Sequence, residues 1–503
     1  ESDTKITLNG SSISVSGDGA TVNGGVVTIA AAGTYVVSGA LTDGQIAVAA
    51  SNTDQIHLVL NGADITSKTG APIYASQCDK LIITLAEGTK NSLTDGGANF
   101  QYADTAEEEP NAALFCKDDL TINGTGSLTV NAGFNNGIGS KDDLLIVSGG
   151  ITVTAANHGL RGNDSVSVLS GSLDITAAGD GIQTNNTEDA SLGWVLIENG
   201  AIAITAGHDG IQADTSIAIS SGDFTITTGA ASSDAASDSC KGIKAAADIA
   251  ITGGSFSIDS GDDSVHANGN IAIDGGIFTL SSGDDGVHAD GNLTVNAGTI
   301  KVTGAYEGLE AANITITGGD MDLSTSDDAL NAAGGADQSG GGERFGGDGF
   351  AAGGAYSIAI SGGNISFTAG GDGIDSNGTI NISGGSIIAI IDSSPDNGAL
   401  DADGGVTFTG GTIIYGGTGT GSAPGGSSTQ SYVFVSSGIT AGKEIVVKKD
   451  GQTLISYTPA ISLQSLALSS PDIQSGESYE VYSGGSLLST VTAGTGGTGM
   501  MGG

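Results

Sequence analysis

Apolar residues recur along most of the chain as short pairs separated by one residue. After Gly286 the pairs are Val287/Ala289, Leu293/Val295 and Ile300/Val302. A period of two is typical of strands with one buried face. Gly-Gly or Asn-Gly lies at many of the corners between pairs, and these dipeptides favour tight turns. The pattern therefore predicts many short strands joined by tight corners.

The pairs repeat at a fixed interval. The phrase GDDSVHANG starts at Gly261, and GDDGVHADG starts 22 residues later at Gly283. We took the small residue at this turn as an anchor, and it falls at Gly137, Gly159, Gly181, Gly210, Gly242, Ser264, Gly286, Gly308, Ala329, Gly373 and Ala399. Insertions are expected at Thr184–Gly193, Ala230–Ser239 and Gly334–Gly354. A repeat of about 22 residues with three strand-like pairs predicts a parallel β-helix, a solenoid whose coils stack about 4.8 Å apart.

The repeat also predicts where the chain divides. Residues 1–40 are expected to cap the first coil, and residues 41–415 to form the parallel β-helix. Residues 416–430 are rich in Gly, Ser and Thr, which is typical of a linker. Residues 431–503 lose the repeat, so we expect a small C-terminal β domain followed by a Gly-rich tail.

The net charge of the chain limits the classes of molecule that it can bind. The chain carries a formal net charge of −42, which argues against nucleic acid and anionic membranes and favours bound cations. The longest apolar run, at Ile387–Ile391, is strand-sized, so no membrane span is expected. The chain starts at Glu1, which favours a removed leader or a trimmed chain. Cys78 and Cys116 precede neighbouring strands, so a disulfide and two free thiols are both open.

Acidic residues recur immediately before the anchors and would stack as columns. Like charges at this spacing repel and raise one another's pKa, whereas Ca²⁺ between neighbouring carboxylates would cancel the repulsion. Asp-Gly turns that use Asp for backbone geometry alone are the alternative. The candidate Ca²⁺ ligands are Asp180, Asp209, Asp262, Asp263, Asp284, Asp285, Glu307, Asp327 and Asp328.

A second column is expected two residues after each anchor, pointing outward beside the acids. It offers a hydrogen-bonding side chain on every rung, which suits a long polymer lying along the solenoid, although a solvated face would look the same. His266 and His288 lie one rung apart and could hold a transition metal with nearby acids. The candidate ligand-binding residues are Arg161, Gln183, Gln212, Lys244, His266, His288 and Glu310.

Several phrases resemble a known family. They are Asn61-Gly-Ala-Asp-Ile-Thr-Ser, Gly70-Ala-Pro-Ile-Tyr, Ile82-Ile-Thr-Leu-Ala-Glu-Gly-Thr, Lys117-Asp-Asp-Leu-Thr-Ile-Asn-Gly, Ser140-Lys-Asp-Asp-Leu and Gly159-Leu-Arg-Gly. Across roughly residues 40–410 the chain resembles secreted bacterial carbohydrate-binding proteins with a right-handed parallel β-helix, related in fold to pectate lyases. The resemblance implies Ca²⁺ binding and affinity for acidic sugars such as polygalacturonate, without established catalysis. The acid columns come from spacing, not from this resemblance.

Three functions are compatible with these patterns. The first is an extracellular, non-catalytic protein that binds acidic polysaccharide with the help of Ca²⁺. The second is a structural subunit that forms filaments or matrix fibres through the solenoid ends or the C-terminal tail. The third is a polyuronate lyase, in which resemblance to lyases of this fold implies an Arg or Lys base, and Arg161, Lys241 and Lys244 lie on the right strip. We expect binding without catalysis.

Overall fold

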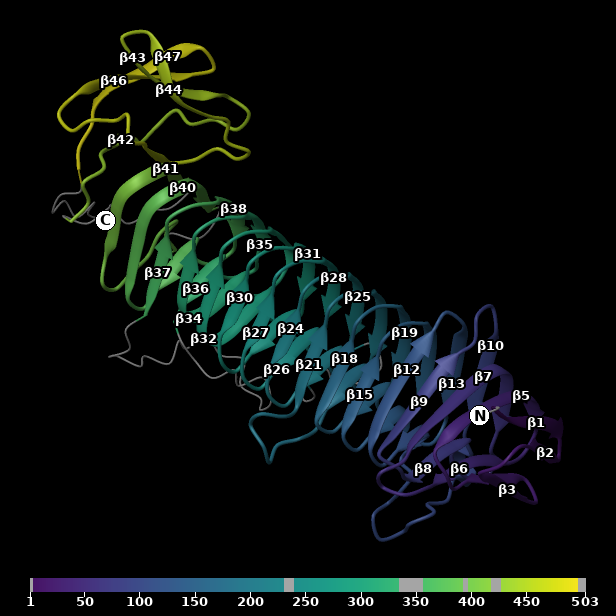
Figure 1. Ribbon diagram of the computed structural model, residues 1–503. Coiled ribbons are helices and arrows are strands. Elements are labelled where there is room, and N and C mark those ends of the chain that lie inside the picture. Colours follow the sequence, from purple (N-terminus) through teal and green to yellow (C-terminus); the bar gives the residue numbers. More distant parts are fainter. Residues whose placement is uncertain (1–2, 230–238, 334–355, 392–396, 418–426, 496–503) are drawn as a thin grey trace. The chain divides into compact units, whose positions relative to one another are not determined.

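The computed structural model describes residues 3–229, 239–333, 356–391, 397–417 and 427–495 (Figure 1). The chain divides into two compact units, Glu1–Asp262 (unit 1) and Asp263–Gly503 (unit 2). Among the described residues every regular element is a β-strand, apart from one 3-10 turn at Gly97–Asn99. None of them forms a helix that is long and apolar enough to cross a membrane. The all-β architecture predicted from the alternation is therefore confirmed.

Unit 1 opens with two antiparallel pairings. β1 (Thr4–Gly10) pairs with β2 (Ile13–Ser16), and β3 (Ala20–Asn23) pairs with β4 (Val26–Ile29). β1 also pairs in parallel with β5 (Gly33–Leu41). Parallel pairing thus begins inside the segment 1–40 that was expected to act as a cap.

A parallel ladder in unit 1 carries the site described below. From β8 onward each member pairs with the strand three places later in the chain. Its members pair in the order β4, β6 (Gln45–Ala49), β8 (Ile73–Gln77), β11 (Ala112–Cys116), β14 (Asn136–Ser140), β17 (Leu160–Gly162), β20 (Ile182–Thr184), β23 (Ile211–Ala213) and β26 (Ile243–Ala245). This regular register is that of a solenoid-like fold.

Two further parallel ladders complete unit 1. One contains β7 (Gln55–Thr66), β9 (Lys80–Leu85), β12 (Asp119–Gly124), β15 (Asp143–Ile146), β18 (Ser165–Val168), β21 (Trp194–Ile197), β24 (Ile217–Ile219) and β27 (Ile249–Ile251). The other contains β5, β7, β10 (Lys90–Thr94), β13 (Ser127–Ala132), β16 (Gly150–Ala155), β19 (Ser172–Ala177), β22 (Ala201–Ala206), β25 (Asp223–Thr228) and β28 (Ser255–Ser260).

The core of unit 1 is a set of stacked apolar rows. Ile138, Leu160 and Ile182 occupy matching positions on β14, β17 and β20 and are fully buried. Phe224 and Phe256 stack with ring centroids 4.6 Å apart. Burial of one such side chain contributes about 1.5–3 kcal/mol. The residues between them alternate outward, so each strand supplies one side chain to the core and the next to the surface.

Unit 2 continues the same kind of parallel pairing. One ladder contains β29 (Val265–Ala267), β32 (Val287–Val295), β34 (Leu309–Ile316), β36 (Leu330–Ala332) and β39 (Ile374–Ser376). A second contains β30 (Ile271–Ile273), β32, β34, β37 (Ser357–Ile360), β40 (Thr379–Ile391) and β41 (Val406–Gly417). A third contains β31 (Ile277–Ser282), β33 (Thr299–Gly304), β35 (Asp320–Ser324), β38 (Asn364–Ala369), β40 and β41.

The last strands of unit 2 pair antiparallel. β45 (Ser465–Ser469) pairs with both β41 and β42 (Tyr432–Val435). A separate four-stranded sheet has the order β44 (Gln452–Tyr457), β43 (Ile445–Lys449), β46 (Ser478–Ser483) and β47 (Ser486–Thr492). Tyr479 and Val481 lie in the apolar cluster of these strands, both fully buried.

Several expected boundaries shift in the structure. Gly416 and Gly417 end β41 instead of starting a linker. The Ser428 hydroxyl oxygen accepts a hydrogen bond from the backbone N–H of Phe408 in that strand at 3.0 Å. Residues 418–426, the insertion at 334–354, most of the one at 230–239 and the end of the tail (496–503) lie outside the described residues. Cys78 and Cys116 are buried free thiols with Sγ atoms 4.0 Å apart.

Candidate functional site

The expected polar column of unit 1 is present as a row across neighbouring strands. Register places Arg161 beside Gln183 on the next strand, then Gln212, then Lys244. Phe115 and Gly139 occupy the two preceding positions of the same row. The four polar side chains are half-buried rather than fully solvated. Sequence spacing therefore predicted the alignment of this row correctly.

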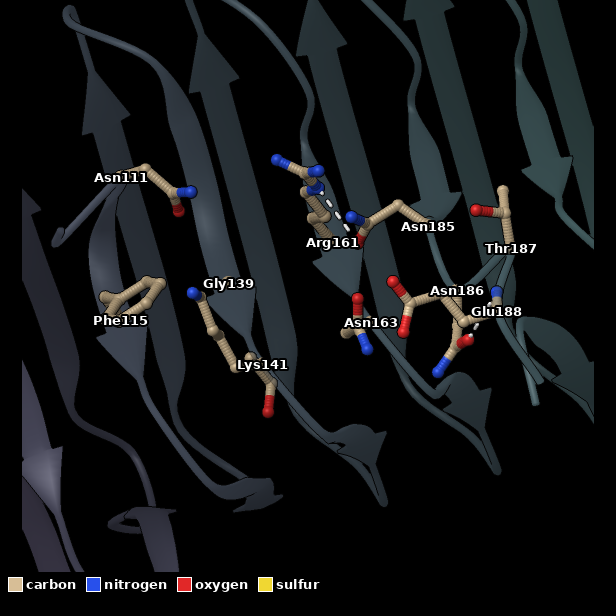
Figure 2. Close-up of a pocket in the computed structure, with 11 residues that line it drawn as sticks. Asn111, Phe115, Gly139, Lys141, Arg161, Asn163, Asn185, Asn186, Thr187 and Glu188 are labelled. Carbon is tan, nitrogen blue, oxygen red and sulfur yellow. Dashed lines mark hydrogen bonds between the residues drawn. The ribbon is translucent and has the colours of Figure 1, made fainter. Parts of the chain in front are cut away.

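A cavity of about 470 Å³ lies at the Arg161 end of this row. Its lining residues come from β11, β14 and β17 and from the insertion that follows β20 (Figure 2). Polar groups dominate, with Phe115 as the aromatic member. The lining residues are Asn111, Phe115, Gly139, Ser140, Lys141, Arg161, Asn163, Asn185, Asn186, Thr187 and Glu188.

Arg161 is the central cation of this cavity. Its Nε donates to Asn185 Oδ1 at 3.2 Å, and Figure 2 shows the two side chains facing one another. Burial lowers the pKa of Arg161, while the charges of Asp180 and Asp214 oppose that effect. A guanidinium remains protonated in proteins. Among the described residues the guanidinium makes one hydrogen bond, so it can still present donors to a carboxylate.

Lys141 is the second cation of the cavity, and a buried acid holds it in place. Glu109 is 0% exposed and forms ion pairs with Lys141 and, at 2.9 Å, with Lys117. The hydrogen bond to Glu109 raises the pKa of Lys117. Glu109 belongs to the acidic segment 95–111 that precedes β11, so these ion pairs hold that segment against the neighbouring strands.

The insertion after β20 closes the cavity on its other side. Asn186 Nδ2 donates to Asp164 Oδ1 at 2.7 Å, and Asn163 Nδ2 donates to the same oxygen at 2.8 Å. Asn186 Oδ1 in turn accepts the backbone N–H of Glu188 at 3.1 Å. These bonds fix the start of the insertion against the preceding coil, and Asn185 faces Arg161 as a result.

The acid column of unit 1 is occupied by protein partners. Asp180 Oδ1 accepts the backbone N–H of Asp209 at 3.0 Å, and Asp180 Oδ2 accepts from Gln183 Nε2 at 2.7 Å. Asp209 Oδ1 accepts the N–H of Lys241 at 2.8 Å. Burial raises the pKa of Asp209, and the charge of Lys244 partly offsets this. Each carboxylate therefore joins its own rung to the next one.

Lys241 replaces an acid in this column and neutralises another. Its Nζ lies 2.8 Å from Asp262 Oδ2, and both side chains are buried. Lys244 Nζ lies 3.5 Å from Asp209 Oδ2 and donates to Ser239 Oγ at 2.9 Å. Both lysines are thus engaged with carboxylates of unit 1.

The acid column of unit 2 follows the same rule. Asp263 Oδ1 accepts the N–H of Asp285 at 2.9 Å, and Asp285 Oδ1 accepts the N–H of Glu307 at 3.0 Å. Burial raises the pKa of Asp285 and of Glu307 well above the usual range, and the charge of a neighbouring acid adds to this in both. The sequence anticipated the direction of these shifts, but burial outweighs like-charge repulsion as their cause.

The remaining predicted acids of unit 2 are less buried. Asp328 Oδ1 accepts the N–H of Asp372, and burial together with the charge of Asp327 raises the pKa of Asp328 to about 8. Asp327 and Asp284 are half-buried and take part in backbone bonds with Tyr306. Nearby, Asp372, Asp375 and Asp401 can each offer an oxygen within 4.8 Å of the others.

The polar row of unit 2 departs from expectation in its burial. Register aligns His266, His288, Glu310 and Asn331 on successive strands, as predicted. The predicted outward exposure is wrong for the histidines, since His266 is 3% and His288 is 4% exposed. Each imidazole lies against the acid three residues before it and against Asn268 or Asp290 at the following corner. Those flanking side chains cover the rings.

Sequence reasoning missed part of the cavity in unit 1. Lys141 follows the apolar positions of its coil, and Asn163 and Asn185 follow the ends of strands. These three residues lie outside the repeated positions, so the repeat did not predict their place in the cavity. The signal that existed was the insertion at Thr184–Gly193, because insertions in solenoids gather on one face. The length of an insertion does not tell which way it folds, so Asn185 could not be placed.

Comparisons with known proteins identify relatives of this chain. A model of the family described as carbohydrate-binding domain-containing protein matches residues 23–286. A carbohydrate-binding domain-containing protein of Acetivibrio thermocellus is 45% identical over 138 residues, which is 27% of this chain and 48% of the relative. The chain therefore spans about half the length of that relative.

One solved structure is also similar. It is described as a polysaccharide lyase-like protein from C. thermocellum, determined as a gadolinium derivative. The sequence identity is 41%, and the alignment covers 45% of this chain and 92% of the solved chain with a TM-score of 0.44.

Proposed function

The chain belongs to the family of carbohydrate-binding domain-containing proteins, and from that premise we propose that it binds an acidic polysaccharide without cleaving it. The ligand would be a polyuronate such as polygalacturonate, and Ca²⁺ would assist its binding. The protein would act outside the cell, either released or at the cell surface. The fold proposed for this role is a right-handed parallel β-helix with three strands per coil.

The observation that carries the proposal is the cavity around Arg161. It combines two cations, Arg161 and Lys141, with the amide side chains of Asn111, Asn163 and Asn185. A planar guanidinium suits the two oxygens of a uronate carboxylate, while amides suit sugar hydroxyls. Phe115 adds an apolar surface at one end. The set recognises an anion, although the chain as a whole is strongly negative.

Calcium enters the proposal through that same negative charge. A formal charge of −42 repels a polyuronate until cations intervene. Ca²⁺ takes oxygen ligands, which carboxylates of the protein and of the glycan can both supply. Among the described residues of unit 2, Asp372, Asp375 and Asp401 form an all-oxygen group suited to this ion. Asp180 and Asp209 suit it less well, because protein donors already fill their oxygens.

The engagement of the basic residues supports binding over lyase chemistry. A lyase of this kind needs an unprotonated Arg or Lys near the uronate to remove a proton. Lys141 is paired with Glu109, and Lys241 with Asp262. Arg161 has a lowered pKa but remains protonated. Lys244 is likewise paired with Asp209. Because each of these cations is either protonated or ion-paired with a carboxylate, we propose a non-catalytic role.

Titration calorimetry of polygalacturonate into the protein tests the proposal. We expect binding in millimolar Ca²⁺ and loss of binding in chelator. Arg161→Ala should weaken it about 10–100-fold, since a hydrogen bond to a charged group contributes about 1.5–3 kcal/mol. Arg161→Lys should fall between the two, because it keeps the charge without the fork.

Lys68→Ala is the matched control. Lys68 is an exposed cation of unit 1 that pairs with Asp43 at 3.7 Å, away from the cavity lining. Equal loss in this variant would show that only net charge matters. Unchanged binding in Arg161→Ala would remove the cavity from the proposal. Absence of binding under every condition would favour the filament-forming alternative, which electron microscopy with and without Ca²⁺ then tests.

A further inference from the structure

Unit 2 contains a buried cluster in which imidazole and carboxylate groups converge. It consists of Asp285, His288 and Glu310, whose ligand atoms all lie within 4.8 Å of one another. Asp263, His266 and His288 form a second group that meets the same criterion and shares His288. The two imidazole rings are 4.9 Å apart between centroids. The cluster is separate from the cavity around Arg161, which lies wholly in unit 1.

The contacts of His288 exceed what one proton can satisfy. Its Nδ1 lies 2.6 Å from Glu310 Oε2 and 3.0 Å from Asp285 Oδ2. A ring nitrogen carries one hydrogen at most, so it can donate a well-aligned bond to only one of these oxygens. The same three atoms would all be satisfied by a cation placed between them, with Nδ1 as a lone-pair ligand.

The surroundings have the arrangement that supports a metal-bound histidine. The other ring nitrogen, Nε2, lies 3.3 Å from Asp290 Oδ1, so a carboxylate can accept its hydrogen and fix the tautomer. Asp285 Oδ1 accepts the backbone N–H of Glu307 at 3.0 Å, which leaves Oδ2 directed at His288. Both first-sphere groups are thus held by neighbours.

A second observation concerns Glu307, which lies three residues before Glu310. Glu307 is 7% exposed, and its Oε1 accepts from Asn331 Nδ2 at 2.8 Å. Its Oε2 is buried and has no hydrogen-bond partner among the described residues. The carboxylate of Glu307 lies within electrostatic reach of both Asp285 and Glu310. A buried carboxylate without a partner is costly. A positive charge bound by Asp285 and Glu310, with which Glu307 interacts electrostatically, would lower that cost.

We propose that unit 2 binds a divalent transition-metal ion of the zinc class through His288 Nδ1, Asp285 Oδ2 and Glu310 Oε2. Mixed nitrogen and oxygen ligands favour this class over Ca²⁺, which prefers oxygen alone. Metal–ligand bonds of about 2.0–2.2 Å require the three ligand atoms to separate by some tenths of an ångström. The ion would join β32 to β34, because His288 lies on β32, Asp285 lies two residues before that strand, and Glu310 lies on β34.

Zinc titration by calorimetry, followed by Co²⁺ substitution and visible absorption, tests the site. We expect one equivalent of Zn²⁺ to bind, a Co²⁺ spectrum typical of low coordination number, and no displacement by excess Ca²⁺. Glu310→Gln and His288→Gln should each weaken Zn²⁺ binding at least 10-fold. Asp290→Asn should weaken it about 10–100-fold through the loss of the orienting carboxylate.

Two controls make the outcome decisive. Asp322→Asn removes one exposed negative charge of unit 2 outside the cluster, and His208→Gln removes an exposed histidine of unit 1. Both should bind Zn²⁺ as the parent chain does. If His288→Gln fails to fold, Glu310→Gln at its half-buried position still gives the answer. Absence of saturable binding, displacement by Ca²⁺, or equal binding in Glu310→Gln would overturn the proposal.

Discussion

Acidic side chains in both units serve the backbone of the following rung. Asp180 accepts the N–H of Asp209, and Asp285 accepts that of Glu307. An unsatisfied buried amide costs about 1–3 kcal/mol, so these carboxylates have a structural reason to recur. The repeat predicted the alignment of these acidic residues. The sequence does not indicate whether a carboxylate oxygen faces an ion or a backbone amide.

The pKa of Asp328 leads to a prediction for stability. Burial and the charge of Asp327 raise this pKa from the ordinary value of 3.8 to about 8. The folded state therefore binds the Asp328 proton more tightly than the unfolded state does. The resulting contribution to the free energy of unfolding is fully present below the pKa of the unfolded state. It is lost as the pH rises from about 4 through about 8.

We expect the free energy of unfolding to fall across this pH range, and to fall less in Asp328→Asn. Asn keeps the oxygen that accepts the Asp372 N–H but does not titrate. Urea unfolding at several pH values, in chelator, measures both chains. A variant that reproduces the parent's slope would show that Asp328 ionises normally.

The histidines show how far residue-level prediction extends. The interval between anchors correctly aligned His266 with His288 and Arg161 with Gln183. The interval indicates on which face of the strand a side chain lies, but it does not indicate which other side chains pack over it. His288 is buried because Asp285, Glu310 and Asp290 surround its ring, and those neighbours come from corners and from another rung.

Corner glycines of two kinds set the geometry of the strands. Gly171 and Gly222 have φ of +115° and +128°, which residues with a Cβ rarely adopt. The anchor glycines are restricted by space instead. A Cβ on Gly181 would lie 2.4 Å from Ile204 Cγ2 and 2.6 Å from the Gly210 carbonyl oxygen. The sequence suggested that any small residue fits at an anchor, and at Gly181 this expectation is too permissive.

We predict that Gly181→Ala destabilises the protein by about 1–3 kcal/mol, as overpacking of a close-packed interior does. Gly304→Ala is the control, because a Cβ there meets nothing within 4 Å, and its effect should stay below about 1 kcal/mol. Denaturant unfolding of the two variants beside the parent provides the measurement. Equal stability of Gly181→Ala and the parent would mean that the two rungs separate easily.

Charge acts on the chain as a whole. Asp and Glu total 56 against 14 Lys and Arg, so self-repulsion opposes the compact state. Adding salt shortens the Debye length from about 30 Å at 0.01 M to about 8 Å at 0.15 M. We therefore expect the thermal unfolding midpoint to rise between these NaCl concentrations.

Calorimetric scans across the NaCl series, with chelator present, measure that shift without divalent ions. A sucrose series is the control for effects unrelated to charge, since an uncharged solute does not screen. A midpoint that fell with NaCl would mean that attractive ion pairs such as Lys241–Asp262 and Lys141–Glu109 outweigh the net repulsion.

The bonds from each amide to the preceding carboxylate all run in one direction. Asp180 receives the N–H of Asp209, and Asp209 receives that of Lys241. A coil therefore acquires its last partners only when the following coil arrives. If folding starts from the amino-terminal side, each carboxylate receives its amide donor when the next coil forms, and the acceptors are satisfied in chain order. The leading coil meanwhile presents an unfilled negative group, which discourages a second chain from joining before the next segment of its own chain does.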